Sequence, residues 1–154
     1  MAIYFLDSSA LVKRYISETG SAWVLGLFAP ALDNEFFVAA ITGVEIVAAI
    51  TRRARNGSVA TADAALVCNQ LRSDLQTDYQ VVEITEEIID SGMTLAETQG
   101  LRGYDAVQLA SACAVNKLCI DSGLSPIILV SADNELNLAA TTEGLLVENP
   151  NNYP

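Results

Sequence analysis

Four acidic residues follow short apolar segments that resemble buried strands, and each stands at or near the start of a helical pattern. A group of carboxylates brought together in this way can hold a hard divalent cation. The sequence has no histidine, which excludes Ser-His-Asp triads, Cys-His pairs and zinc motifs that contain histidine. Any chemistry of this chain therefore uses carboxylates, hydroxyls or a bound ion. The four acids are Asp7, Glu45, Asp105 and Asp133.

Each acid has an ordinary structural explanation when it is considered alone. Three of them stand where a helix dipole favours negative charge, and Glu45 follows Thr42 by three residues, as in a capping box. Together they are harder to explain, because two ionised carboxylates about 5 Å apart repel by roughly 3 kcal/mol at an effective dielectric constant of about 20. The helix dipole returns only about 0.3–1 kcal/mol per acid. We therefore expect Mg²⁺ or Mn²⁺ among them.

Hydroxyl side chains flank the first and the last of these acids. Ser8 and Ser9 follow Asp7 directly, and Ser131 precedes Asp133 by two positions. These hydroxyls can hydrogen-bond the carboxylates or a water at the ion, and at least one of them can instead cap a helix. We expect Ser8 and Ser131 to support the site.

Segments that predict strands alternate with segments that predict helices along the chain. Runs of β-branched and aromatic residues predict strands at 3–6, 36–41, 81–84, 127–130 and 145–147. Periodic apolar residues between hydroxyl starts and glycine stops predict helices at 8–15, 21–32, 42–56, 61–76, 85–99, 103–122 and 132–143. This alternation predicts a parallel sheet covered by helices on both faces. The carboxyl ends of its strands share one edge, where the four acids can meet.

Composition limits the class of protein. With 154 residues, 51% of them apolar and 18% charged, the chain predicts one globular domain at 1–150 with a short tail at 151–154. The sequence has no apolar stretch of membrane-spanning length and begins without the basic segment of a secretory signal, so we expect no membrane association and a cytoplasmic location.

The charge balance argues against nonspecific binding of nucleic acid, because the net charge is −11. Six of the eight basic residues nevertheless lie within ten positions of one of the first three acids. They are candidates for contacts with a polyanion, and the alternative is that they form solvated helix faces and surface ion pairs. These residues are Lys13, Arg14, Arg52, Arg53, Arg55 and Arg102.

Four segments carry these features in a fixed order: YFLDSSALVKRY, TGVEIVAAITRRARNG, GLRGYDAVQLASA and ILVSADNELNLAA. This ordered set, which extends over about residues 3–150, resembles the PIN-domain family of ribonucleases, in particular the VapC-like toxins of bacterial toxin–antitoxin pairs. The resemblance implies a three-layer α/β/α sandwich around a parallel sheet and an endoribonuclease that cuts single-stranded RNA with Mg²⁺ or Mn²⁺. It also implies a homodimer and a cognate antitoxin whose tail enters the acidic site.

The resemblance also assigns the site residues. The acidic positions of the family fall on Asp7, Glu45, Asp105 and Asp133, with Ser8 at the supporting hydroxyl position. We expect all four acids to be catalytic and the three aspartates to ligate metal. The last acidic position is the most variable in the family, so Asp121 or Glu135 can contribute in place of Asp133.

Two alternatives to the nuclease remain. One is a catalytically inactive domain of the same fold that binds RNA or a partner protein. The other is a phosphoryl-transfer or receiver domain, which also gathers acids at the strand ends of a parallel sheet. The sequence disfavours the second alternative, because Ser9 occupies the position of the second aspartate of dehalogenase-like enzymes and no lysine follows the strand at 127–130.

Overall fold

Five parallel strands form a single sheet in the computed structural model, which describes all 154 residues. Their order is β3-β2-β1-β4-β5, so the chain builds outward from β1 on one side and then crosses to the other side. The point where this order reverses lies between β1 and β4, and ligands of open α/β sheets bind there, outside the carboxyl ends of the strands. The strands are β1 (Ile3–Leu6), β2 (Glu35–Ala39), β3 (Gln80–Val82), β4 (Ile128–Val130) and β5 (Leu146–Glu148).

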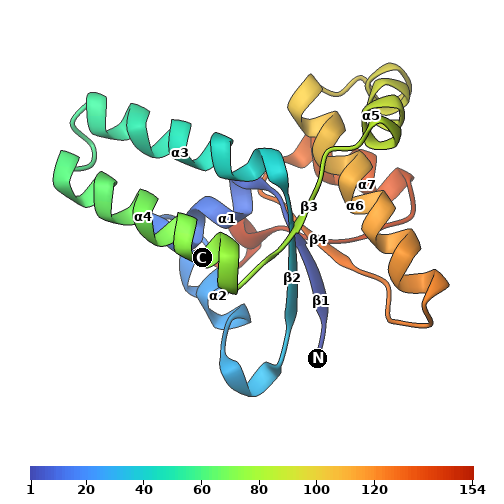
Figure 1. Ribbon diagram of the computed structural model, residues 1–154, viewed down its shortest axis with the longest axis horizontal. Helices are drawn as coiled ribbons and strands as arrows, with labels where there is room; N and C mark the ends of the chain where they lie inside the picture. The colour runs from blue at the N-terminus through green and yellow to red at the C-terminus, as the bar shows by residue number, and fades with distance from the viewer.

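Helices cover both faces of the sheet and confirm the predicted three-layer α/β/α sandwich (Figure 1). One layer contains α1 (Ser8–Tyr15), α2 (Ser21–Leu27), α3 (Ala40–Arg55) and α4 (Thr61–Thr77). The other layer contains α5 (Glu86–Gln99), α6 (Gly103–Asp121) and α7 (Asn134–Thr142). Two short 3₁₀ helices, η1 (Pro30–Leu32) and η2 (Pro150–Asn152), complete the chain. None of the helices combines the length and the hydropathy that crossing a bilayer requires.

The two layers bury separate hydrophobic cores against the same sheet. Successive strand residues point to opposite faces, so Phe5 packs with α5, α6 and α7 while Leu6 packs with α1, α3 and α4. Leu129 and Val130 of β4 divide in the same way. β1 and β4 are therefore buried on both faces, which fixes the place where each strand ends and the site begins.

The predicted helix at 21–32 is wrong in its second half. α2 ends at Leu27, and a separate 3₁₀ turn starts at Pro30. Proline has no amide hydrogen to donate and restricts the residue before it, and Ala29 accordingly has an extended backbone. The predicted strand at 36–41 also ends early, since α3 begins at Ala40.

The predicted capping box at Thr42 is wrong. Thr42 lies inside the first turn of α3, whose N-cap is Ala39, and no side chain caps this helix. The Thr42 hydroxyl is fully buried and accepts a hydrogen bond from Gln108. Thr85, by contrast, caps α5 as its position predicts, and its hydroxyl accepts from the amide of Ile88.

Residues 151–154, predicted as a tail, pack against α2. The rings of Tyr153 and Trp23 stack with centroids 4.6 Å apart. Gly20 precedes α2 with φ +84°, and a Cβ atom there would lie 2.4 Å from the carbonyl oxygen of Pro150. This close approach of two backbones requires glycine.

We predict that Gly20→Ala lowers the free energy of unfolding by about 2–4 kcal/mol, because it adds a clash with Pro150 to the cost of a left-handed backbone. Gly57→Ala is the matched control, since Gly57 has φ +82° with open space at its Cβ position. This control should lose only about 1 kcal/mol. Urea unfolding measures both values, and equal losses would show that the C-terminal segment does not constrain Gly20.

Candidate active site

All four predicted acids line one cavity of about 570 Å³ at the carboxyl edge of the sheet. Asp7 follows β1 directly, and Asp133 follows β4, so these two acids lie on either side of the point where the strand order reverses. Glu45 reaches the cavity from α3, and Asp105 from the first turn of α6. Asp7 and Asp133 are 126 positions apart in the sequence, and the fold brings both to the same cavity.

Asp7 is the most enclosed of these acids, with 3% of its surface exposed. The single hydroxyl proton of Ser9 is shared between both carboxylate oxygens of Asp7, which lie 2.8 and 3.0 Å from Oγ, and Ser131 Oγ donates to Oδ2 at 3.0 Å. The amide of Ala10 donates to Oδ1 at 3.0 Å, so Asp7 also caps α1. Burial, with a smaller contribution from the charge of Asp105, raises the pKa of Asp7 to about 7 although these hydrogen bonds act to lower it.

Glu45 is oriented by a residue that the sequence did not single out. Gln108 Nε2 donates to Glu45 Oε2 at 3.1 Å and also contacts the hydroxyls of Thr42 at 2.8 Å and Ser8 at 3.2 Å. Only 2% of the Gln108 surface is exposed, and its amide joins α6 to α3 and α1 at the wall of the cavity. A signal was present, because Gln108 lies three positions after Asp105 in an otherwise apolar segment.

Electrostatic coupling links the acids across the cavity. Burial raises the pKa of Glu45, and the nearby charge of Asp105 adds to the shift. Burial also raises the pKa of Asp105, and the charge of Asp133 adds to this effect. No lysine or arginine forms an ion pair with any of the four acids. The cavity therefore holds negative charge that the protein does not neutralise by direct pairing.

The three serines divide into two roles. Ser9 and Ser131 hold Asp7, and Ser9 Oγ also accepts from the amide of Ala132 at 2.9 Å, which ties the end of β1 to the end of β4. Ser8 lines the cavity and makes its hydrogen bond to Gln108. The support predicted for Ser131 therefore acts on Asp7, whereas Ser8 belongs to the network of Glu45.

The structure brings only some of the predicted basic residues to this cavity. Arg52, Arg53 and Arg102 line it, whereas Lys13 and Arg14 do not. Lys13 is 5% exposed and pairs with Glu18 at 3.0 Å.

Arg14 points into a separate network. It pairs with Asp78 at 2.6 Å, contacts the hydroxyl of Tyr79 and lies 4.1 Å from the ring centroid of Phe28. Lys13 and Arg14 thus hold α1 to its neighbours, so the prediction that they bind RNA loses its structural basis.

The donor set of the cavity fits a hard divalent cation, because every candidate ligand is an oxygen atom. No three side chains of aspartate, glutamate, cysteine or histidine lie close enough together to ligate one ion. Mg²⁺ typically binds through one or two carboxylates and keeps several waters. Residues that could contribute are Asp7, Glu45, Asp105 and Asp133; Glu135 lies near enough for its charge to raise the pKa of Asp105, and Asp121 is at the far end of α6.

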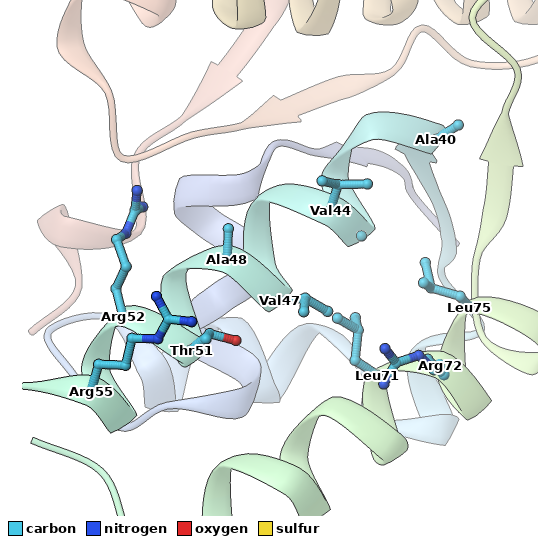
Figure 2. Close-up of a pocket in the computed structure, with 11 residues that line it drawn as sticks. Ala40, Val44, Val47, Ala48, Thr51, Arg52, Arg55, Leu71, Arg72 and Leu75 are labelled. Carbon is cyan, nitrogen blue, oxygen red and sulfur yellow. The ribbon is translucent and has the colours of Figure 1, made fainter. Parts of the chain in front are cut away.

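A second and more apolar cavity of about 650 Å³ lies between α3 and α4 (Figure 2). Val47 of α3 and Leu71 of α4 form part of its lining, and Arg52 and Arg55 lie toward the end of α3 (Figure 2). Val44, Ala48 and Arg52 line both cavities, so the two adjoin along this row of α3.

Comparison with known proteins gives consistent results. The family described as PIN domain matches residues 4–140. Ribonuclease VapC45 of Mycobacterium tuberculosis is 31% identical over 150 residues, which cover 96% of this chain and 95% of that protein. Among solved structures, PAE2754 from Pyrobaculum aerophilum has a TM-score of 0.62 at 25% identity, with 95% of this chain and 89% of that chain covered.

A toxin–antitoxin complex from Klebsiella pneumoniae contains a chain with the same fold. Its TM-score is 0.62 at 15% identity, and the superposition covers 96% of this chain and 97% of that chain.

We predict that millimolar Mn²⁺ raises the melting temperature by about 5 °C relative to EDTA, because the ion relieves repulsion among the four acids. Asp7→Asn and Asp105→Asn should each remove most of this shift. Asp90→Asn is the matched control, since Asp90 is an exposed acid on α5 outside the cavity. Thermal melts followed by circular dichroism measure the effect, and identical melting in Mn²⁺ and EDTA would argue against an ion site.

We predict that Gln108→Met, which keeps the side-chain volume, lowers the free energy of unfolding by about 1–3 kcal/mol because Thr42 and Glu45 lose their donor. It should also reduce the Mn²⁺ shift. Ser111→Ala removes a buried hydroxyl that bonds only to the carbonyl of Val107 in its own helix, so it should cost about 1 kcal/mol and keep the shift. Urea unfolding and Mn²⁺ melts compare the pair; equal Mn²⁺ shifts would show that Gln108 is only a packing residue.

Proposed function

The chain belongs to the PIN-domain family, among its VapC-like members, and from this membership we propose that it is a divalent-metal-dependent endoribonuclease. One observation carries the proposal: four carboxylates from distant parts of the chain line one cavity without a basic side chain paired to any of them. The named ribonuclease relative, similar over 95% of its own length, supports RNA as the substrate.

The residues of the cavity have distinct tasks in this proposal. Asp7 is held rigidly by Ser9 and Ser131 and would be the central ligand of the ion, with Asp105 and Asp133 beside it. Glu45, which Gln108 orients from below, would ligate or take a proton from the attacking water. A divalent ion bound here would lower the pKa of a water molecule that it holds and would neutralise negative charge that develops on the phosphate.

We propose that the substrate is single-stranded. The net charge of −11 leaves little positive surface for the many phosphate contacts that a duplex offers. Arg52 and Arg102 line the acidic cavity and form no ion pair, so they are available to one or two phosphates of a single strand. Arg53 also lines the cavity, but its guanidinium pairs with Glu18 at 3.0 Å.

A toxin–antitoxin pair is the biological setting that we propose. The ribonuclease relative carries the VapC name, and a neighbour of the same fold was solved as a toxin–antitoxin complex. A segment of an antitoxin lying in the apolar cavity between α3 and α4 would reach the acidic cavity along Val44, Ala48 and Arg52. We further propose a homodimer, which the family resemblance implies, together with one PIN-like domain over 1–150 and a cytoplasmic location, which the sequence predicts.

The competing function is a catalytically inactive domain of the same fold that binds RNA or a partner. Both proposals require an intact fold and a surface for RNA, so binding alone does not separate them. Cleavage that depends on the acids and on the ion does separate them.

We predict that the purified chain cleaves single-stranded RNA in Mg²⁺ or Mn²⁺ and not in EDTA. Asp7→Asn and Asp105→Asn should each reduce the rate at least about 100-fold, since each removes a charged ligand, while circular dichroism shows both variants folded. Asp90→Asn is again the control and should keep full activity. RNA that stays intact in Mn²⁺, or cleavage that persists in both cavity variants, would overturn the nuclease proposal.

A further inference from the structure

Tyr104 stands on the rim of the acidic cavity with 63% of its surface exposed. It precedes Asp105 in the first turn of α6. Its side chain also lines a smaller apolar hollow of about 410 Å³, formed with Ile41, Ile84, Ile89 and Val107 at the starts of α3, α5 and α6. Tyr104 is therefore shared by the acidic cavity and an apolar space beside it.

Tyr104 differs from the other four tyrosines, because neither its ring nor its hydroxyl has a specific partner in the protein. Of the five tyrosines, Tyr4 and Tyr153 stack on other aromatic rings, and Tyr15 and Tyr79 hydrogen-bond each other through their hydroxyls. Tyr104 has no aromatic partner, no cation over its ring and no hydrogen bond from its hydroxyl. The Tyr104 ring therefore lies at the acidic cavity without a partner from the protein, and an aromatic ring offers a large, rigid apolar face to a ligand.

The charges around Tyr104 indicate an anionic ligand that also has a flat apolar part. Arg102, two positions earlier, lines the acidic cavity and makes no ion pair, and its positive charge lowers the pKa of Asp105 against the effect of burial. Arg52 lies across the same cavity and is also unpaired. A nucleotide combines a phosphate for such an arginine with a base for the tyrosine ring.

We propose that Tyr104 and the apolar hollow beside it form a subsite for one unpaired nucleobase of RNA, next to the phosphate that the acidic cavity holds. The base stacks on the exposed ring, and Arg102 contacts the adjoining phosphate. A base inside a duplex cannot reach this ring, because it is already stacked between its neighbours. The inference rests on the proposed function and identifies an unpaired base as the part of the RNA that the Tyr104 ring contacts.

The test is a binding measurement with a short fluorescent single-stranded RNA and the Asp7→Asn protein in EDTA, conditions in which slow cleavage does not disturb the measurement. Tyr104→Ala should weaken binding about 10- to 100-fold, whereas Tyr104→Phe and Tyr104→Trp should retain it, because stacking needs the ring and not the hydroxyl. Leu138→Ala is the matched control, since Leu138 is 72% exposed on α7 and lines none of these cavities.

A series of RNAs with a single abasic position identifies the base. One position should weaken binding to the protein with Tyr104, and this dependence should disappear with Tyr104→Ala. A flat series, in which no abasic position weakens RNA binding, overturns the subsite. A Tyr104→Ala protein that binds RNA with unchanged affinity also overturns it. If light scattering shows that Tyr104→Ala turns a dimer into a monomer while the abasic series is flat, a second copy of the chain covers this ring and the proposal is likewise overturned.

The outcome separates the subsite from the nuclease proposal. RNA binding that depends on Tyr104, combined with no cleavage by the unsubstituted protein, retains the subsite and removes the nuclease. Cleavage by the unsubstituted protein with a flat abasic series retains the nuclease and removes the subsite.

Discussion

Enclosure of unpaired carboxylates at one edge of the sheet is the constraint on which the site depends. Asp7 is enclosed by protein on nearly all sides, and burial raises its pKa to about 7 although three neighbours donate hydrogen bonds to it. Burial also raises the pKa values of Glu45 and Asp105. A fold that only needed stability would not gather these charges without paired cations. The arrangement is consistent with a site that is completed by a ligand.

The scaffold holds this group through strands that are buried between the two helical layers. β1 and β4 are buried on both faces, so the two hydrophobic cores fix the ends of these strands on either side of the topological switch. Ser9 and Ser131 then bridge the two strand ends around Asp7. Gln108 connects the opposite helical layer to Glu45. Apolar packing therefore positions the backbone, and a few buried polar contacts orient the acids.

The distribution of basic residues decides which positive charges are available at the acidic cavity. Lys13, Arg14 and Arg53 are used in internal ion pairs, although all three lie near the acids in sequence. Arg52 and Arg102 remain available at the cavity. With a net charge of −11, the protein cannot rely on general attraction to a polyanion. A substrate must therefore be bound by a few specific contacts, which is why an unpartnered aromatic ring at the rim is significant.

The sequence alone determined the alternation of strands and helices and the position of Asp7 and Asp133 at strand ends, because those patterns depend on neighbouring residues and on the periods of the two structures. It also allowed the family to be identified from the order of its motifs. It could not show that Thr42 is buried and accepts from Gln108 in place of capping α3, or that Arg14 pairs with Asp78. Those facts depend on which side chains meet across 60 or more positions, as the hydrogen bond between Arg14 and Asp78 shows with a separation of 64. Only tertiary packing sets such distances, and it alone decided that Gln108 orients Glu45 and that Tyr104 is the tyrosine left without a partner.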